Sequence, residues 1–320
     1  MKISVITPSL NTGAHIERAI KSVLEQAYEN FEHIIIDGLS TDNTIEILKQ
    51  YPHLIWTSEA DSGQSNAMNK GFAMATGDII VYLNADDYFL PKAFDTILPF
   101  FQKGEKFVVG DANIVLLDGQ TVRVTPKVSH ESILYHWVDW TPIQEGRVAS
   151  SFPNNPVQYF YLRKVQEKFP FNEDNHFTMD LEFLMYASSY YDFYKIDDIL
   201  GVYTLYEDAK SIVASNDIEN YWTFENFSYI DNLIENWAQE KKRSFKNEQQ
   251  KGYIRRALNQ YRNKMNKELK QKDEQLHSKQ ELIEALNKKI IDLHQMVSSK
   301  NPLNTIRAIR FIKKHYKDTL

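Results

Sequence analysis

Residues 31–37, FEHIIID, carry three isoleucines in a row at positions 34–36. A continuous apolar run of this kind is typical of a strand that is buried on both faces. Similar short runs occur at residues 3–6 (ISVI), 54–56 (LIW) and 78–83 (DIIVYL). The segments between them carry apolar residues at helical spacing, at 16–27, 45–48 and 65–75. Strands that alternate with helices predict an α/β fold, with a parallel sheet covered by helices on both faces.

The pattern changes after residue 110. Asp118 and Gly119 lie between two strand-like runs, 114–117 and 121–125, and predict a hairpin. Further strands are expected at 157–162, 193–196 and 200–205, with a helix at 179–189. No linker separates these elements from the first half, so residues 1–206 are expected to share one mixed sheet.

The remainder of the chain, from about residue 216, reads as helical. Within 262–298, eight of ten positions at 3-4 spacing are apolar, which predicts a short coiled coil. An amphipathic helix docked on its own domain is the alternative. A break at Asn301-Pro302 separates this part from residues 301–320, which read as a basic amphipathic helix.

Charge is distributed unevenly along the 320 residues. The net charge is −6, but residues 241–320 hold 21 Lys and Arg against 8 Asp and Glu, and residues 1–240 hold 16 against 35. An acidic body with a basic tail indicates that the tail meets an anionic partner, such as a bilayer surface or a polyanion, and a solvated basic helix is the alternative. The absence of cysteine excludes disulfides, thiolate metal sites and cysteine nucleophiles. No apolar run reaches the roughly 18 residues of a membrane span, and no signal peptide is recognisable.

Carboxylates follow three of the first four expected strands. Asp37 follows the second strand, Asp61 the third, and Asp86 and Asp87 the fourth. The carboxyl ends of parallel strands share one edge of a sheet, so these side chains are expected to converge there. Clustered carboxylates repel one another unless a cation compensates them, and a hard ion such as Mg²⁺ or Mn²⁺ prefers oxygen ligands. The pattern therefore predicts a divalent metal beside a diphosphate ligand.

Two common phosphate-binding loops are missing from the sequence. Neither G-x-x-x-x-G-K-[ST] nor G-x-G-x-x-G occurs, and the first strand exit contains one glycine, Gly13. P-loop NTPases and dinucleotide-dependent oxidoreductases are thereby disfavoured.

Five motifs in order resemble the family 2 glycosyltransferases of GT-A fold, in their bacterial polysaccharide-biosynthesis form. The motifs are 4–11 (SVITPSLN), 36–42 (IDGLSTD), 61–71 (DSGQSNAMNKG), 75–78 (ATGD) and 83–87 (LNADD). The resemblance implies a GT-A, Rossmann-like mixed sheet with helices on both faces, followed by the helical C-terminal extension. It also implies transfer of a sugar from a nucleotide-diphosphate donor to an acceptor hydroxyl, with inversion and a divalent metal.

The resemblance also assigns roles to particular residues. It places the nucleotide-sugar donor against Pro8, Ser9, Asp37, Asp61, Asn69, Asn84 and Asp86, and the metal on Asp86 and Asp87. Asn84 stands where the family has the first aspartate of its D-x-D-type motif, so the metal contact shifts to the two aspartates that follow.

The expected general base lies in the acceptor half. Residues 177–184, FTMDLEFL, resemble the family segment that supplies this base, and they place Asp180 on its position. A carboxylate is needed there because a sugar hydroxyl is a poor nucleophile until its proton is taken. From the residues alone, Asp180 is equally well explained as a helix N-cap.

These observations favour a metal-dependent glycosyltransferase that uses a UDP-sugar or similar donor and extends a glycan or a lipid-linked glycan. The expected domains are 1–215, with a nucleotide-binding half (1–110) and an acceptor half (111–215), then 216–300 and 301–320. The protein is expected to be cytoplasmic, peripheral at the inner face of the plasma membrane through 301–320, and homo-oligomeric through 262–298. Nucleic acid is not an expected partner. A sugar nucleotidyltransferase and a non-catalytic coiled-coil scaffold are the alternatives.

Overall fold

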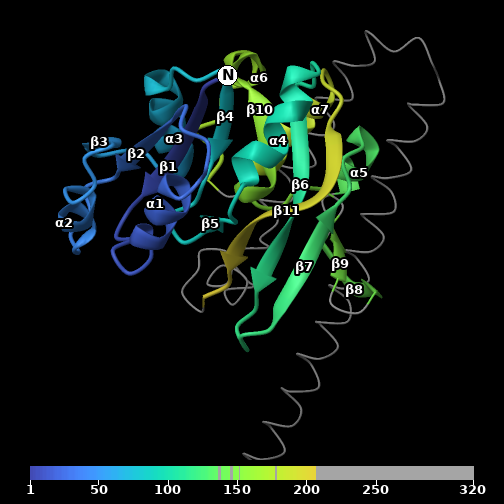
Figure 1. Cartoon of the computed structure of the whole chain (residues 1–320), viewed down its shortest axis with the longest axis horizontal. Coiled ribbons are helices and arrows are strands. Elements are labelled where there is room, and N and C mark those ends of the chain that lie inside the picture. The colour runs from blue at the N-terminus through green and yellow to red at the C-terminus, as the bar shows by residue number, and fades with distance from the viewer. Residues whose placement is uncertain (136–137, 145–146, 151, 177–178, 207–320) are drawn as a thin grey trace, which may run out of the picture. The chain divides into compact units, whose positions relative to one another are not determined.

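The computed structural model describes residues 1–135, 138–144, 147–150, 152–176 and 179–206 (Figure 1). Within these residues, eleven strands form one sheet. The strands are β1 (Ile3–Ser9), β2 (Phe31–Asp37), β3 (Leu54–Ser58), β4 (Ile79–Tyr82), β5 (Tyr88–Phe89), β6 (Phe107–Val115), β7 (Thr121–Pro126), β8 (Val138–Gln144), β9 (Arg147–Ser150), β10 (Tyr159–Leu162) and β11 (Tyr194–Thr204).

The sheet is parallel in its first half and mixed in its second. Strands β3, β2, β1 and β4 run parallel in that order. β10 then pairs antiparallel with both β4 and β6, and β6 continues to β7, β9 and β8. β11 runs parallel to β6 and pairs antiparallel with β5. The predicted mixed α/β sheet and the hairpin at Asp118-Gly119, between β6 and β7, are confirmed.

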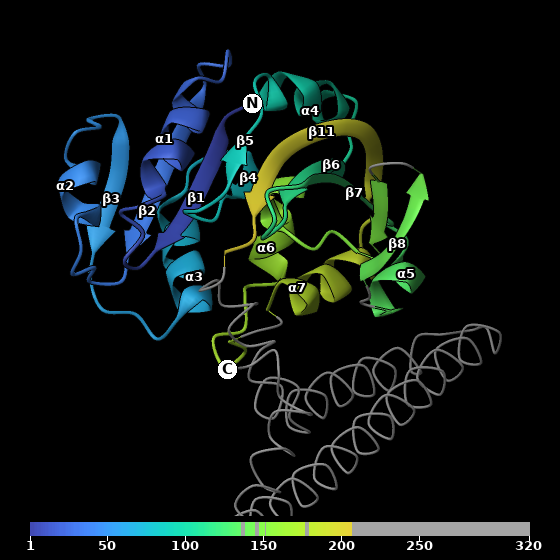
Figure 2. The same cartoon turned by 90° about the horizontal axis from the view of Figure 1, so that it is seen from below.

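Helices cover both faces of this sheet. They are α1 (Ile16–Leu24), α2 (Thr44–Leu48), α3 (Gln64–Met74), α4 (Ala93–Gln102), α5 (His130–Tyr135), α6 (Arg163–Lys168) and α7 (Met179–Ser188), with a 3₁₀ turn at Pro156–Gln158. Figure 2 shows α4 on one side of the sheet and α3, α6 and α7 on the other.

Alternate side chains of β1 point to opposite faces of the sheet, because successive residues of a strand alternate in direction. Val5 joins the core cluster that contains Val23 of α1 and Phe94 of α4. Ile6 points to the opposite face, where α3 crosses so closely that a Cβ on Gly71 would lie 2.4 Å from its Cγ2 atom. Gly71 is therefore the residue that lets α3 pack directly on β1.

The last described strand differs from its prediction. The two strands expected at 193–196 and 200–205 are one strand, β11, with register shifts between Lys195 and Ile199 and between Ile199 and Gly201. At the second shift a Cβ on Gly201 would lie 2.2 Å from Val157, so glycine permits the close approach. Irregular pairing of this kind breaks the local alternation, which is why the sequence pattern divided the strand.

The predicted coiled coil at 262–298, the basic helix at 301–320 and the domains from residue 216 onward lie outside the described residues. The oligomer and the membrane contact assigned to them stay predictions. No helix within the described part of the chain is long and apolar enough to span a bilayer.

One buried histidine links the stability of this fold to pH. His33 lies on β2 with no exposed surface, and its Nε2 atom is 3.0 Å from the Thr7 hydroxyl. Burial, with a smaller effect from His53, lowers the pKa of His33 to about 3. In the unfolded chain the same imidazole titrates near 6.5. Between these pH values His33 is protonated in the unfolded state and neutral in the folded state. The free energy of unfolding therefore falls as the pH falls below 6.5.

We expect His33 to cost about 2 kcal/mol of unfolding free energy between pH 7 and pH 5. Chemical denaturation across this range measures the slope, and His33→Gln should flatten it whatever its effect at pH 7. The same substitution at the exposed His176 serves as a control for the change from His to Gln. Glu32 acts in a lower range. Burial raises the pKa of Glu32, but hydrogen bonds led by that from Lys2 outweigh this and lower it to about 2, so its contribution is lost below about 4.5. If His33→Gln kept the wild-type slope of unfolding free energy between pH 7 and pH 5, the assignment of that slope to His33 would be wrong.

Candidate functional site

The carboxyl ends of β1 and β2 lie side by side, because Ser9 and Asp37 are partners in the register of the two strands. The Gly38 amide donates a hydrogen bond to the Ser9 carbonyl at 2.8 Å. The Ser9 hydroxyl lies 2.7 Å from the hydroxyl of Thr12. Pro8 precedes Ser9 on β1 and is half-buried. Pro8, Ser9 and Asp37 thus share one edge of the sheet, as predicted.

The Asp37 carboxylate is buried and held by the loop that follows β2 and by the last residue of β3. It accepts hydrogen bonds from the Ser40 amide at 3.0 Å, from the Ser40 hydroxyl, and from the Ser58 hydroxyl at 2.6 Å. Three hydrogen-bond donors therefore already occupy the oxygens of this carboxyl group. Asp37 therefore shapes the edge of the sheet and is poorly suited to bind a metal.

Asp61 reaches the same edge from the end of β3. A Cβ on Gly38 would lie 2.8 Å from the Oδ2 atom of Asp61, so the carboxylate occupies the space that only glycine leaves there. The other oxygen of Asp61 accepts a hydrogen bond from the Gly63 amide at 2.9 Å. The exits of β1, β2 and β3 therefore meet at Ser9, Asp37 and Asp61.

The two neighbouring aspartates that follow β4, Asp86 and Asp87, lie in different environments. Asp87 is buried, and its Oδ2 atom accepts hydrogen bonds from Asn84 and Asn155, both at 2.9 Å. Burial, with the neighbouring charge of Asp86 adding to it, raises the pKa of Asp87 well above its usual range. Asp86 itself is half-buried. Asn84 also accepts a hydrogen bond from Gln64, the first residue of α3, at 3.3 Å.

These surroundings divide the predicted metal ligands. The described residues contain no group of three or more His, Asp or Glu side chains that could hold a metal, so the expected convergence of several carboxylates on one ion is not seen there. Asp87 is enclosed by amide donors that a ligand role would displace. Asp86 fits the role better, because Mg²⁺ commonly binds one or two carboxylates together with substrate phosphates and water.

Asn69 occupies a different environment from the other predicted donor residues. Its side-chain amide donates to the Phe171 carbonyl at 2.8 Å and to Glu173 at 3.0 Å, and it accepts from the Phe171 amide at 3.1 Å. These bonds tie α3 to the segment that precedes α7. The donor contact assigned to Asn69 stays a prediction, and its visible role is to join these two segments.

The same segment brings the start of α7 toward the sheet edge. The Ser65 hydroxyl, in the first turn of α3, donates to the Asn175 carbonyl at 3.1 Å. The Asn175 side chain in turn donates to Glu182 of α7 at 2.8 Å. Because α3 begins directly after Asp61 and Gly63, these contacts attach the N-terminus of α7 to the exit of β3.

Asp180 lies in the first turn of α7 and is half-buried. Its charge acts on three buried phenols of the neighbouring strands. Burial chiefly raises the pKa values of Tyr82, Tyr159 and Tyr161, and the negative charge of Asp180 raises them further. Tyr82 belongs to β4 and Tyr159 and Tyr161 to β10, and α7 lies on the same side of the sheet as α3 (Figure 2).

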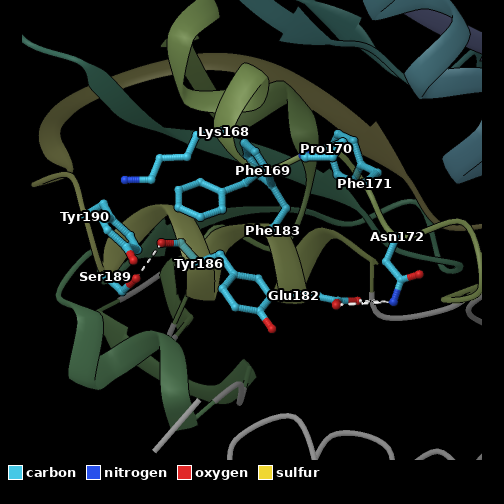
Figure 3. Close-up of a pocket in the computed structure, with 10 residues that line it drawn as sticks. All are labelled: Lys168, Phe169, Pro170, Phe171, Asn172, Glu182, Phe183, Tyr186, Ser189 and Tyr190. Carbon is cyan, nitrogen blue, oxygen red and sulfur yellow. Dashed lines mark hydrogen bonds between the residues drawn. The ribbon is translucent and has the colours of Figure 1, made fainter. Parts of the chain in front are cut away.

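A pocket of about 270 Å³ opens along another face of α7, against residues 168–172. Figure 3 shows its aromatic walls and the Glu182 carboxylate held by Asn172. The rings of Phe169 and Tyr186 stack with centroids 5.9 Å apart, and the Lys168 ammonium lies 3.5 Å from the Tyr190 centroid. None of the residues that line this pocket belongs to the strand exits.

Sequence comparison identifies the family. The profile of Glycosyl transferase family 2 matches residues 4–163, half of the chain, including all four strand exits. The chain belongs to Glycosyl transferase family 2. An uncharacterized glycosyltransferase of Nostoc is 40% identical over 174 residues, which cover 52% of this chain and 53% of that protein. The putative teichuronic acid biosynthesis glycosyltransferase TuaG of Bacillus subtilis is 36% identical over 107 residues, 32% of this chain and 42% of TuaG.

The fold agrees with this family. TarS of S. aureus, residues 1–349, superposes with a TM-score of 0.51 at 19% identity, over 73% of this chain and 69% of that structure. At this identity the likeness shows the GT-A fold alone. The alignments span about half, or less, of the length of the curated relatives just named.

Two residues of this family 2 domain were missed by the sequence analysis. Asn155 binds Asp87 from 68 residues away, and Arg18 of α1 donates to the Asp86 carbonyl at 2.6 Å. Neither belongs to a motif, and no local pattern points to them. Their contacts arise from the way β10 and α1 pack beside β4.

Proposed function

We propose that this protein transfers a sugar from a nucleoside-diphosphate donor to an acceptor hydroxyl. The observation that carries the proposal is the meeting of three strand exits at Ser9, Asp37 and Asp61, within the segment that matches the family. Ligands of open α/β sheets bind at such an edge. Pro8, Ser9, Asp37 and Asp61 would receive the nucleoside, and the Asn84–Asp87 loop would receive the diphosphate.

The proposed donor is a UDP-sugar. TarS, which shares the fold, has been crystallised with UDP and with UDP-GlcNAc. The proposed acceptor is a growing surface glycan, free or lipid-linked. TuaG is named for teichuronic acid biosynthesis, which supports an acceptor of this class.

A divalent cation is proposed at Asp86. When bound, it would supply positive charge to the phosphate oxygens of the leaving group. Asp86 offers a half-buried carboxylate beside the strand edge, whereas Asp87 is already enclosed by Asn84 and Asn155.

The proposed reaction is a single displacement with inversion. The acceptor oxygen forms a bond to the anomeric carbon as the bond from that carbon to the diphosphate oxygen breaks. The Asp180 carboxylate takes the acceptor proton, and the nucleoside diphosphate leaves with the electron pair. A general base of this kind contributes about 10²- to 10⁴-fold to the rate.

Thermal unfolding with a panel of nucleotide-sugars and Mn²⁺ tests the donor. A ligand at one hundred times its Kd adds about 2.7 kcal/mol of stability, which raises the melting temperature by several degrees. We expect stabilisation by a UDP-sugar, followed by slow release of UDP. Stabilisation by none of the panel contradicts the proposal. Pyrophosphate release from a nucleoside triphosphate and a sugar phosphate would instead support a nucleotidyltransferase.

A further inference from the structure

Arg18 joins three segments that are far apart in the sequence. It lies on the exposed side of α1, and its Nη2 atom donates to the Asp86 carbonyl at 2.6 Å and to the Tyr206 hydroxyl at 3.1 Å. Its guanidinium carbon also lies 4.4 Å from the centroid of the Tyr88 ring. An exposed arginine ordinarily samples many rotamers, so three simultaneous contacts hold this one in place.

Tyr206 is held from a second side. The His15 ring, one turn before Arg18, lies 4.5 Å from the Tyr206 ring, centroid to centroid, with the planes tilted by 33°. Tyr206 lies two residues beyond the end of β11, which ends at Thr204. Arg18 and His15 together therefore join α1 to the end of β11 and to the Asp86 loop.

The guanidinium keeps donor capacity for a ligand. It has five N–H donors, and the two on Nη2 are used by Asp86 and Tyr206. Within the described part of the chain, the three on Nε and Nη1 have no hydrogen-bond partner. These donors lie on different sides of the guanidinium from Nη2, so each can donate a separate hydrogen bond to a phosphate oxygen.

We propose that Arg18 binds the diphosphate of the donor beside Asp86, with Tyr206 and Tyr88 fixing its guanidinium in place. This inference rests on the proposed function. The Asp86 carboxylate brings negative charge to the place where a diphosphate would add more. A permanently charged arginine offsets that charge, whether or not a metal is bound.

The test compares nucleotides that differ by one phosphate. Titration calorimetry on the full chain measures the affinities of UDP and UMP, and of GDP and GMP, with Mn²⁺ and with EDTA. In wild type the diphosphate should bind more tightly than the monophosphate. Arg18→Met should reduce this preference about tenfold or more, with and without metal, because charge-assisted hydrogen bonds to phosphate are lost. Arg18→Lys should lose less, since it keeps the positive charge.

Lys21→Met is the matched control. Lys21 lies one turn further along α1, is exposed, and pairs with Glu17 at 2.9 Å, so its loss should leave the preference unchanged. An unchanged preference in Arg18→Met, with wild type binding UDP or GDP, overturns the role of Arg18 alone. A loss seen only with Mn²⁺ also overturns direct binding, because Arg18 would then act through the Asp86 loop. Failure of wild type to bind any of these nucleotides counts against the proposed function itself.

Discussion

Asp180→Asn is expected to lower kcat for sugar transfer by about 10²- to 10⁴-fold and to leave donor affinity within about twofold of wild type. The amide keeps the size of the side chain but cannot accept the proton of the acceptor hydroxyl. The charge that Asp180 places against Tyr82, Tyr159 and Tyr161 is lost as well. Because these phenols are neutral and buried, the loss should not destabilise the fold. Steady-state transfer assays and donor calorimetry give the two quantities separately.

Asp174→Asn is the matched control for this variant. Asp174 is exposed in the segment that precedes α7, so the same chemical change there should leave kcat unaltered. If Asp180→Asn keeps wild-type turnover, Asp180 is not the base, and its role reduces to that of a helix N-terminal residue. If donor affinity collapses together with kcat, the residue supports the site rather than the proton transfer.

The sequence predicted the sheet because local periodicity and burial agree in its first half. The isoleucines at 34–36 lie on a strand buried on both faces, and β1 to β4 are parallel as expected. In the second half β10 and β11 pair with strands that lie far away in the chain. Such pairing is set by tertiary packing, which periodicity does not encode.

The candidate site could also be predicted only in part. Strand-exit reasoning brought Ser9, Asp37 and Asp61 to one edge, because that conclusion needs only the direction of parallel strands. It could not separate Asp86 from Asp87, since the difference comes from Asn155, which reaches Asp87 from the turn before β10. Arg18 escaped notice for the same reason, because its partners follow β4 and β11.

The different environments of Asp86 and Asp87 lead to the second prediction with a large expected effect. Asp86→Ala is expected to abolish the metal-dependent part of donor binding, so that its affinity with Mn²⁺ equals that of wild type in EDTA. Its melting temperature should change little, because the side chain is only half-buried. Calorimetry with UDP, with and without Mn²⁺, measures the first quantity. Metal-dependent affinity that survives in Asp86→Ala would place the ion elsewhere.

For Asp87→Ala we expect the opposite result: the protein loses stability, and the metal-dependent part of donor binding remains. It removes the acceptor of two amide groups, on Asn84 and Asn155, and each buried unpaired group costs about 1–3 kcal/mol. We expect a loss of about 2–4 kcal/mol of unfolding free energy, with a melting temperature lower by roughly 5–10 °C. Asp87→Asn keeps a neutral acceptor oxygen, so it should recover most of this stability. Equal stability in Asp87→Ala and wild type would mean that the two asparagines find other partners, and Asp87 would again compete with Asp86 as the metal ligand.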